Sequence, residues 1–157
     1  MPKAEIEIEK LLTWAYRDEL SKRQTSAAEG IWDRIEDNVF ADDATVTLGK
    51  MFPADPPLFM ARTPHGYHDK AVIKADLERA GFKDISIETL TAVSRAPTAE
   101  YVATAYCQGT PLRGEIEARD ASKLQAATDA VAEAIRKRHG SGPVEAKIQA
   151  LVITARP

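Results

Sequence analysis

The stretch AKIQALVIT, residues 146–154, decides the fold expected for this chain. Ile148, Ala150 and Val152 alternate with Leu151 and Ile153, so both faces of an extended segment are apolar here. Such a pattern is typical of a strand that lies well inside a sheet, because an edge or solvent-facing strand keeps one polar face.

A second strand is predicted at 84–93, where Ile85 and Ile87 face one way and Ser86 and Glu88 face the other. Apolar residues at helical spacing, N-cap residues and glycine stops predict helices over about 5–20, 38–51, 69–81, 98–109 and 121–139, with a short segment from Pro111. The expected fold class is α+β, with several helices packed on a small sheet.

The sequence also predicts helix caps, buried helix faces and a linker. Asn38 and Asp69 are in position to cap two of them. The helix from Thr98 is expected to bury the stripe Tyr101, Val102, Ala105 and Tyr106, and the helix 121–139 the stripe Leu124, Ala127, Val131 and Ile135. Residues 21–30 are small and polar, which predicts a linker after the first helix.

The segment FPADPPLFMARTPHGYHD, residues 52–69, is predicted to be a loop because its four prolines oppose a regular helix or a central strand. A loop this long in a compact domain is usually functional or mobile. Its mixture of aromatic, basic and imidazole side chains suits a small-molecule pocket wall. The candidate ligand-pocket residues are Phe59, Arg62, His65, Tyr67 and His68.

Two other interpretations of HGYH, residues 65–68, stay open. The imidazoles of His65 and His68 could bind a metal if further ligands joined them, although the third histidine, His139, is distant in sequence. The plainer alternative is a turn in which Gly66 supplies backbone freedom and His65 or Tyr67 packs or caps. We predict neither a metal site nor a bound cofactor for this chain.

Composition limits the classes of function. The chain has 157 residues, which suits one domain with a real core. The formal net charge is −3, with 21 basic and 24 acidic residues, so no strong basic field exists for nucleic acid. No stretch approaches the roughly 20 apolar residues of a membrane span, and no apolar signal segment opens the chain. We therefore expect a cytoplasmic protein without membrane or nucleic-acid partners.

The sequence offers little for catalysis. Cys107 is the single cysteine and lies in a helical pattern, where a buried, inert thiol is expected. Glu115 and Glu117 are two residues apart and do not share a helix face, so a solvated face is favoured over an acid–base pair. The GxG at 140–142 follows a helix and precedes a strand, which is the inverse of a dinucleotide loop. No catalytic or cofactor-binding residue is predicted.

Several stretches carry a family resemblance from about residue 31 to 157. They are WDRIEDNVFAD (32–42), MFPADPPLFMARTPHGYHD (51–69), DLERAGF (76–82), SRAPTAE (94–100), CQGTPLRGEIEARD (107–120), ATDAVAEAI (127–135) and GPVEAKIQALVITA (142–155). In order and spacing this set resembles the C-terminal portion of class I S-adenosylmethionine-dependent methyltransferases. The resemblance implies that 84–93 and 146–154 form the antiparallel final strand pair of that family's sheet.

The departure from the family is as informative as the resemblance. The family binds S-adenosylmethionine on the first half of its sheet, with a glycine-rich loop and an acid, and this chain supplies neither element. The resemblance thus implies a truncated methyltransferase-like domain at 31–157, preceded by an N-terminal helical extension and linker at 1–30. Strands without their usual partners invite association, so we expect a homodimer.

Three functions follow from this interpretation. The first is a non-catalytic module, derived from a methyltransferase, that binds a small molecule or a protein. The second is the substrate-side component of a methyltransferase that a partner chain completes. The third is a structural or interaction protein that assembles through the N-terminal helix.

Overall fold

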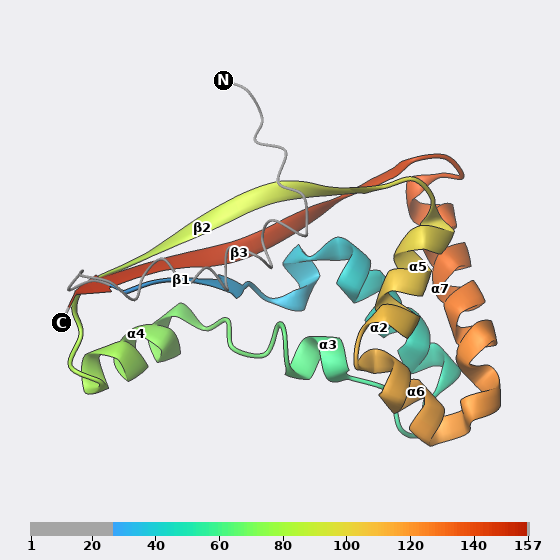
Figure 1. Cartoon of the computed structure of the whole chain (residues 1–157), viewed down its shortest axis with the longest axis horizontal. Helices are drawn as coiled ribbons and strands as arrows, with labels where there is room; N and C mark the ends of the chain where they lie inside the picture. Colours follow the sequence, from blue (N-terminus) through green and yellow to red (C-terminus); the bar gives the residue numbers. More distant parts are fainter. Residues whose placement is uncertain (1–26, 157) are drawn as a thin grey trace.

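The computed structural model describes residues 27–156, and Figure 1 shows their arrangement. The elements, in chain order, are β1 (Ala27–Trp32), the 3-10 turn η2 (Ile35–Asp37), α2 (Val39–Met51), α3 (Phe59–Arg62), α4 (Lys70–Arg79), β2 (Lys83–Ala96), α5 (Ala99–Gly109), α6 (Leu112–Asp120), the 3-10 turn η3 (Ala121–Lys123), α7 (Leu124–His139) and β3 (Val144–Arg156). The predicted α+β class is confirmed. The helix predicted at 5–20 lies outside the described residues.

The strands of residues 27–156 form a three-stranded antiparallel sheet in the order β1–β3–β2. The prediction that 146–154 lies inside a sheet is confirmed, since β3 has a partner on each side. The expected antiparallel pair is also confirmed, and it is longer than predicted, running from Ser86 opposite Thr154 to Ala96 opposite Val144. A register shift between Lys83 and Ser86 contains Asp84, whose φ is 47°.

The linker prediction needs a correction at its C-terminal end. Residues 27–30 form the first part of β1, with Ala27 opposite Ala155 and Gly30 opposite Val152. Small and polar residues are typical of a linker, and this stretch lacks the alternation of apolar and polar residues that predicts a strand. They form a strand here because their backbone groups pair with the central strand β3, an interaction that does not depend on side-chain type.

The two apolar faces of β3 serve two different clusters. Val144 and Ala146 belong to the main core with α2, α5, α6 and α7, whereas Leu151 and Ile153 pack with Ile73 of α4. Successive side chains of a strand alternate, so these pairs project from opposite faces of β3. Figure 1 shows the helical group at one end of the sheet and α4 near the other end. The two-faced sequence pattern thus reflects a strand that changes its covered face along its length.

Helix packing confirms one predicted stripe and corrects another. On α7, Ala127, Val131 and Ile135 are fully buried, as predicted. On α5 the buried face is Ala99, Val102, Ala103 and Cys107, and Tyr101 is 64% exposed. The buried face shares Val102 with the predicted stripe and is otherwise rotated from it, because the small residues Ala99, Ala103 and Cys107 allow α5 to approach α7 closely.

The predicted caps differ in what their side chains do. Asp69 accepts hydrogen bonds from the backbone N–H groups of Ala71 and Val72 and so caps α4, as predicted. Asn38 is at the N-cap position of α2, but its side chain makes no capping hydrogen bond. It reaches across to β3 instead, where its Oδ1 accepts from Gln149 N at 3.1 Å and its Nδ2 donates to Gln149 O at 3.1 Å.

The Asn38 amide therefore occupies the place of a strand backbone beside β3. Its Nδ2 also donates to the carbonyl oxygens of Asp33 and Arg34, and Asn38 is only 3% exposed. Directly beyond β1, Asp33 N donates to Gln149 O as well. One side chain thus satisfies backbone groups from β3 and from the turn before α2, which buried groups require.

We predict that Asn38→Asp destabilises the fold, because a carboxylate oxygen would face the three carbonyl oxygens that now accept from Nδ2. The free energy of unfolding should fall by about 3 kcal/mol, as expected when a buried donor becomes a charged acceptor. Urea unfolding followed by circular dichroism measures this. Gln125→Ala, which removes an exposed amide hydrogen bond on α7, is the control and should change stability by less than about 0.5 kcal/mol. Equal stability of Asn38→Asp and wild type would contradict the assignment.

Candidate functional site

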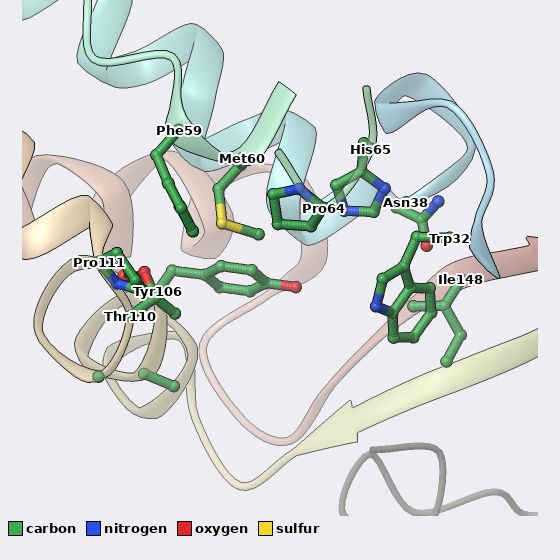
Figure 2. Close-up of a pocket in the computed structure, with 12 residues that line it drawn as sticks. Trp32, Asn38, Phe59, Met60, Pro64, His65, Tyr106, Thr110, Pro111 and Ile148 are labelled. Atoms are coloured by element: carbon green, nitrogen blue, oxygen red, sulfur yellow. Dashed lines mark hydrogen bonds between the residues drawn. The ribbon is translucent and has the colours of Figure 1, made fainter. Parts of the chain in front are cut away.

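A pocket of about 430 Å³ lies between the sheet, the 52–69 segment, helix α5 and the turn that leads from α5 into α6. Figure 2 shows its lining side chains. The lining residues are Trp32, Asn38, Phe59, Met60, Pro64, His65, Ala105, Tyr106, Gly109, Thr110, Pro111 and Ile148. None of them carries a formal charge at neutral pH when histidine is neutral. Most of the surface that a ligand would touch is therefore apolar.

The 52–69 segment forms one wall, and its conformation differs in part from the predicted loop. It contains a single helical turn, α3, which starts after the buried Pro57 and ends before Pro64. The prolines are compatible with this turn because they lie outside it. Glu115 of α6 accepts hydrogen bonds from the N–H groups of Leu58 and Phe59 at 3.0 and 3.1 Å, which satisfies the start of α3.

Helix α6 fastens the same segment at further points. Arg62 donates to the second oxygen of Glu115 at 2.6 Å, and Arg119 donates to the carbonyl oxygens of Asp55 and Pro56. Partial burial is the largest single influence on the pKa of Glu115 and raises it. The guanidinium of Arg62 and the backbone N–H donors together outweigh burial, so the pKa of Glu115 is lowered. The expected solvated face is thus wrong for Glu115, which holds the pocket wall in place.

His65 enters the pocket from a tight turn after α3. It is 5% exposed, its Nδ1 lies 2.8 Å from the carbonyl oxygen of Asp33, and its ring is 5.9 Å from that of Trp32. A Cβ at Gly66 would meet the carbonyl oxygen of Arg62 at 2.1 Å. The turn thus needs glycine for space, whereas the sequence suggested a need for backbone freedom.

Hydrogen bonding and burial together define the protonation of His65. A carbonyl oxygen only accepts, so Nδ1 carries the hydrogen, and burial lowers the pKa of His65 below its ordinary value of 6.5. The neutral ring then has an unprotonated Nε2, which is a hydrogen-bond acceptor. The Asp33 carbonyl oxygen favours the charged ring, but burial is the larger effect.

Tyr106 of α5 supplies the second polar group of the pocket. Figure 2 shows its ring extending across the pocket, with the hydroxyl pointing toward the side that holds Trp32 and His65. Burial raises the pKa of Tyr106 to about 12, so the hydroxyl keeps its proton at neutral pH. Within residues 27–156 it makes no side-chain hydrogen bond.

The structure separates the five residues predicted from the sequence. Phe59 and His65 line the pocket together, whereas Arg62, Tyr67 and His68 are outside its lining. Arg62 pairs with Glu115, and the Tyr67 hydroxyl donates to Asp76 of α4 at 2.6 Å. Whether any of them contacts a ligand stays a prediction.

Sequence reasoning missed most of the remaining lining. Trp32 precedes the polar turn before α2, and the sequence pattern predicts Ile148 inside a strand. The helical spacing predicts Tyr106 in a buried helix stripe. Local patterns cannot show that these residues meet, because they come from β1, β3 and α5.

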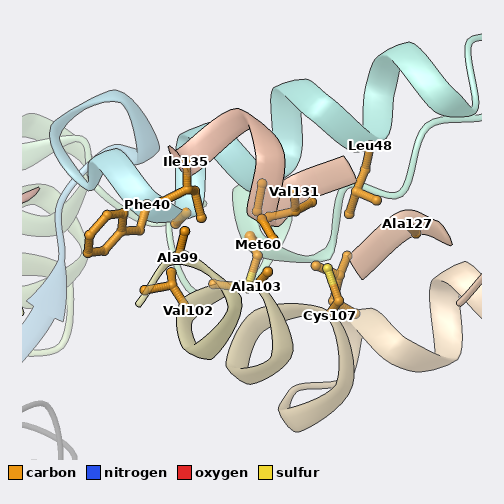
Figure 3. Close-up of a cluster of buried hydrophobic side chains, with 14 of the residues drawn as sticks. Phe40, Leu48, Met60, Ala99, Val102, Ala103, Cys107, Ala127, Val131 and Ile135 are labelled. Carbon is orange, nitrogen blue, oxygen red and sulfur yellow. The ribbon is translucent and has the colours of Figure 1, made fainter. Parts of the chain in front are cut away.

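Cys107 adjoins Tyr106 in sequence but points into the main core, among the buried side chains that Figure 3 shows. It is fully buried, and burial raises the pKa of its thiol to about 11. The thiol is therefore protonated and unreactive at neutral pH, as the sequence predicted. In the described part of the chain, no three His, Cys, Asp or Glu side chains gather as a metal site needs.

The chain matches no model of a protein family, and no curated protein matches it by sequence. Among residues 27–156, no helix has the length and apolar character needed to cross a membrane.

We predict that His65 makes stability depend on pH between about 7.5 and 5.5. Its pKa is lower in the folded state than the unfolded value of about 6.5. Below that value the unfolded chain binds a proton that the folded chain does not, so the free energy of unfolding decreases as pH falls, by at most about 1.4 kcal/mol per pH unit. His65→Asn keeps a donor for the Asp33 carbonyl oxygen but does not titrate.

Urea unfolding at several pH values tests this expectation. The variant should lose less stability than wild type over the interval from pH 7.5 to 5.5. Carboxylates contribute little there, because their ordinary pKa values lie near 4. An unchanged pH slope in His65→Asn would show that His65 is not the group responsible.

Proposed function

We propose that this chain is a non-catalytic binding module whose pocket accepts an uncharged small molecule. The observation that carries the proposal is the combination of a pocket of about 430 Å³ with a lining that has no formally charged side chain. Ligand sites of small molecules are usually apolar and concave, with a few polar groups that fix orientation. Tyr106 and His65 are such groups here.

The methyltransferase resemblance stays a prediction, and this pocket does not suit S-adenosylmethionine. That cofactor carries a sulfonium cation, an ammonium, a carboxylate and ribose hydroxyls. The lining offers neither an acidic side chain for the ribose or ammonium nor a basic one for the carboxylate. The enzyme alternative, in which a partner chain supplies the cofactor half, therefore places the cofactor elsewhere and treats this pocket as the substrate side.

Filling the pocket is the direct test. Nile red is an uncharged fluorescent dye whose emission shifts to the blue in apolar sites, and we expect it to bind wild type at micromolar concentration. Ala105→Trp places an indole at an exposed lining position and should abolish the shift. Thr104→Trp alters the neighbouring exposed residue outside the lining and is the matched control, which should bind as wild type does. Equal dye binding by both variants would contradict the proposal.

Titration calorimetry with S-adenosylmethionine separates the module from an enzyme that is complete by itself. We expect no heat of binding from the purified chain. Tight binding of the cofactor would overturn the non-catalytic assignment and favour the methyltransferase alternative.

We also propose that the module is a homodimer. In the sheet of the described residues, β2 is an end strand of 14 residues, and Leu90 at its middle is 39% exposed. End strands with exposed apolar side chains favour association. Assembly through the N-terminal segment, where Leu11 belongs to the predicted apolar stripe, is the alternative arrangement.

Two point variants of the full chain distinguish these arrangements by sedimentation or light scattering. If β2 forms the interface, Leu90→Lys should shift the protein toward monomer at micromolar concentration, because two like charges would meet across a two-fold axis. Leu11→Lys should have that effect if the N-terminal segment forms it. Mass action favours a dimer at high protein concentration, so a wild-type protein that is monomeric at about 100 µM would refute dimerisation.

A further inference from the structure

Three polar atoms of the pocket lining have unused hydrogen-bonding capacity. Asn38 and Thr110 use their side chains within the fold, Asn38 on β3 and Thr110 on the carbonyl oxygen of Tyr106. In contrast, the Tyr106 hydroxyl, the Trp32 Nε1 and the His65 Nε2 make no hydrogen bond to any residue in 27–156. Since no buried side-chain nitrogen or oxygen in the described part of the chain lacks a partner, these three atoms are open to water. A ligand that displaces this water must pair with them, because a polar atom left unpaired away from water is costly.

The hydrogen-bonding roles of these atoms are determined by the structure. Trp32 Nε1 can only donate, the neutral His65 can only accept at Nε2 because Nδ1 donates to Asp33, and the Tyr106 hydroxyl can do either. In Figure 2 the Tyr106 hydroxyl points toward the part of the pocket that Trp32 and His65 border. A ligand hydroxyl at that end could accept from Tyr106 or Trp32 and donate to His65.

The walls of the pocket specify the rest of the ligand. Four aromatic rings border it, those of Trp32, Phe59, His65 and Tyr106, together with the thioether of Met60. Flat aromatic surfaces pack well against such rings, in stacked or edge-to-face arrangements. A lining without charged side chains disfavours ions, since an ion would lose its hydration without a compensating partner.

On these grounds, and resting on the proposed function, we infer that the pocket selects uncharged hydroxy-aromatic molecules, with the ligand hydroxyl held between Tyr106 and His65. The class is phenolic, and a fused two-ring phenol fits within the volume of about 430 Å³. The Tyr106 hydroxyl determines specificity for the ligand oxygen, and the aromatic walls provide most of the affinity.

A matched ligand pair tests the inference by titration calorimetry at pH 7. The probes are 2-naphthol and naphthalene, which have the same ring system and differ by the hydroxyl. Wild type should bind 2-naphthol about tenfold more tightly, as expected for one to two net hydrogen bonds. Tyr106→Phe should weaken 2-naphthol binding about fivefold and leave naphthalene binding within twofold. Tyr101→Phe removes an exposed hydroxyl outside the lining and should match wild type.

The outcomes separate this inference from the proposed function. Equal affinity of wild type for the two probes, or an equal loss of both in Tyr106→Phe, would overturn the phenolic specificity while leaving a binding pocket in place. Binding of neither probe, with Nile red still bound, would also overturn the inference and retain the pocket. Failure of the probes and of Nile red together would overturn the proposed function itself.

Discussion

The side-chain amide of Asn38 joins the parts of this structure that the pocket requires. It pairs with the backbone of Gln149 in β3 and binds the carbonyl oxygens of Asp33 and Arg34. It thereby holds the end of β1 and the start of α2 against the central strand. The same Asp33 carbonyl oxygen accepts from His65, so the pocket histidine depends on this arrangement. A buried amide with both its donor and acceptor sides satisfied is rigid, which preorganises the site.

A second group of contacts, from α6, holds the opposite wall. Glu115 satisfies the start of α3 and pairs with Arg62, and Arg119 binds backbone carbonyl oxygens of the proline-rich segment. The four prolines of this segment have no backbone N–H group and interrupt regular structure, so a side chain from a neighbouring helix supplies donors for its carbonyl oxygens. Phe59 and His65 are fixed relative to Tyr106 because the wall is tied to α6, which follows α5 directly in the chain.

The distribution of chemistry across α5 also supports a binding role over covalent catalysis. Tyr106 faces the pocket and keeps its proton, while the adjacent Cys107 is buried in the core with a strongly raised pKa. The chain thus directs a hydrogen-bonding group into the pocket and its single thiol away from it.

The sequence by itself determined the elements whose signals are local. The two-faced apolar pattern of 146–154 predicted the inner strand, and Asp69, Gly81 and Gly140 marked helix ends, because capping and positive φ act over a few residues. It also directed attention to Phe59 and His65. Only the tertiary structure decided that residues 27–30 are a strand, that Asn38 binds β3 and that Trp32, Tyr106 and Ile148 share one pocket. Those features arise from contacts between residues far apart in the chain, and local periodicity carries no information about such partners.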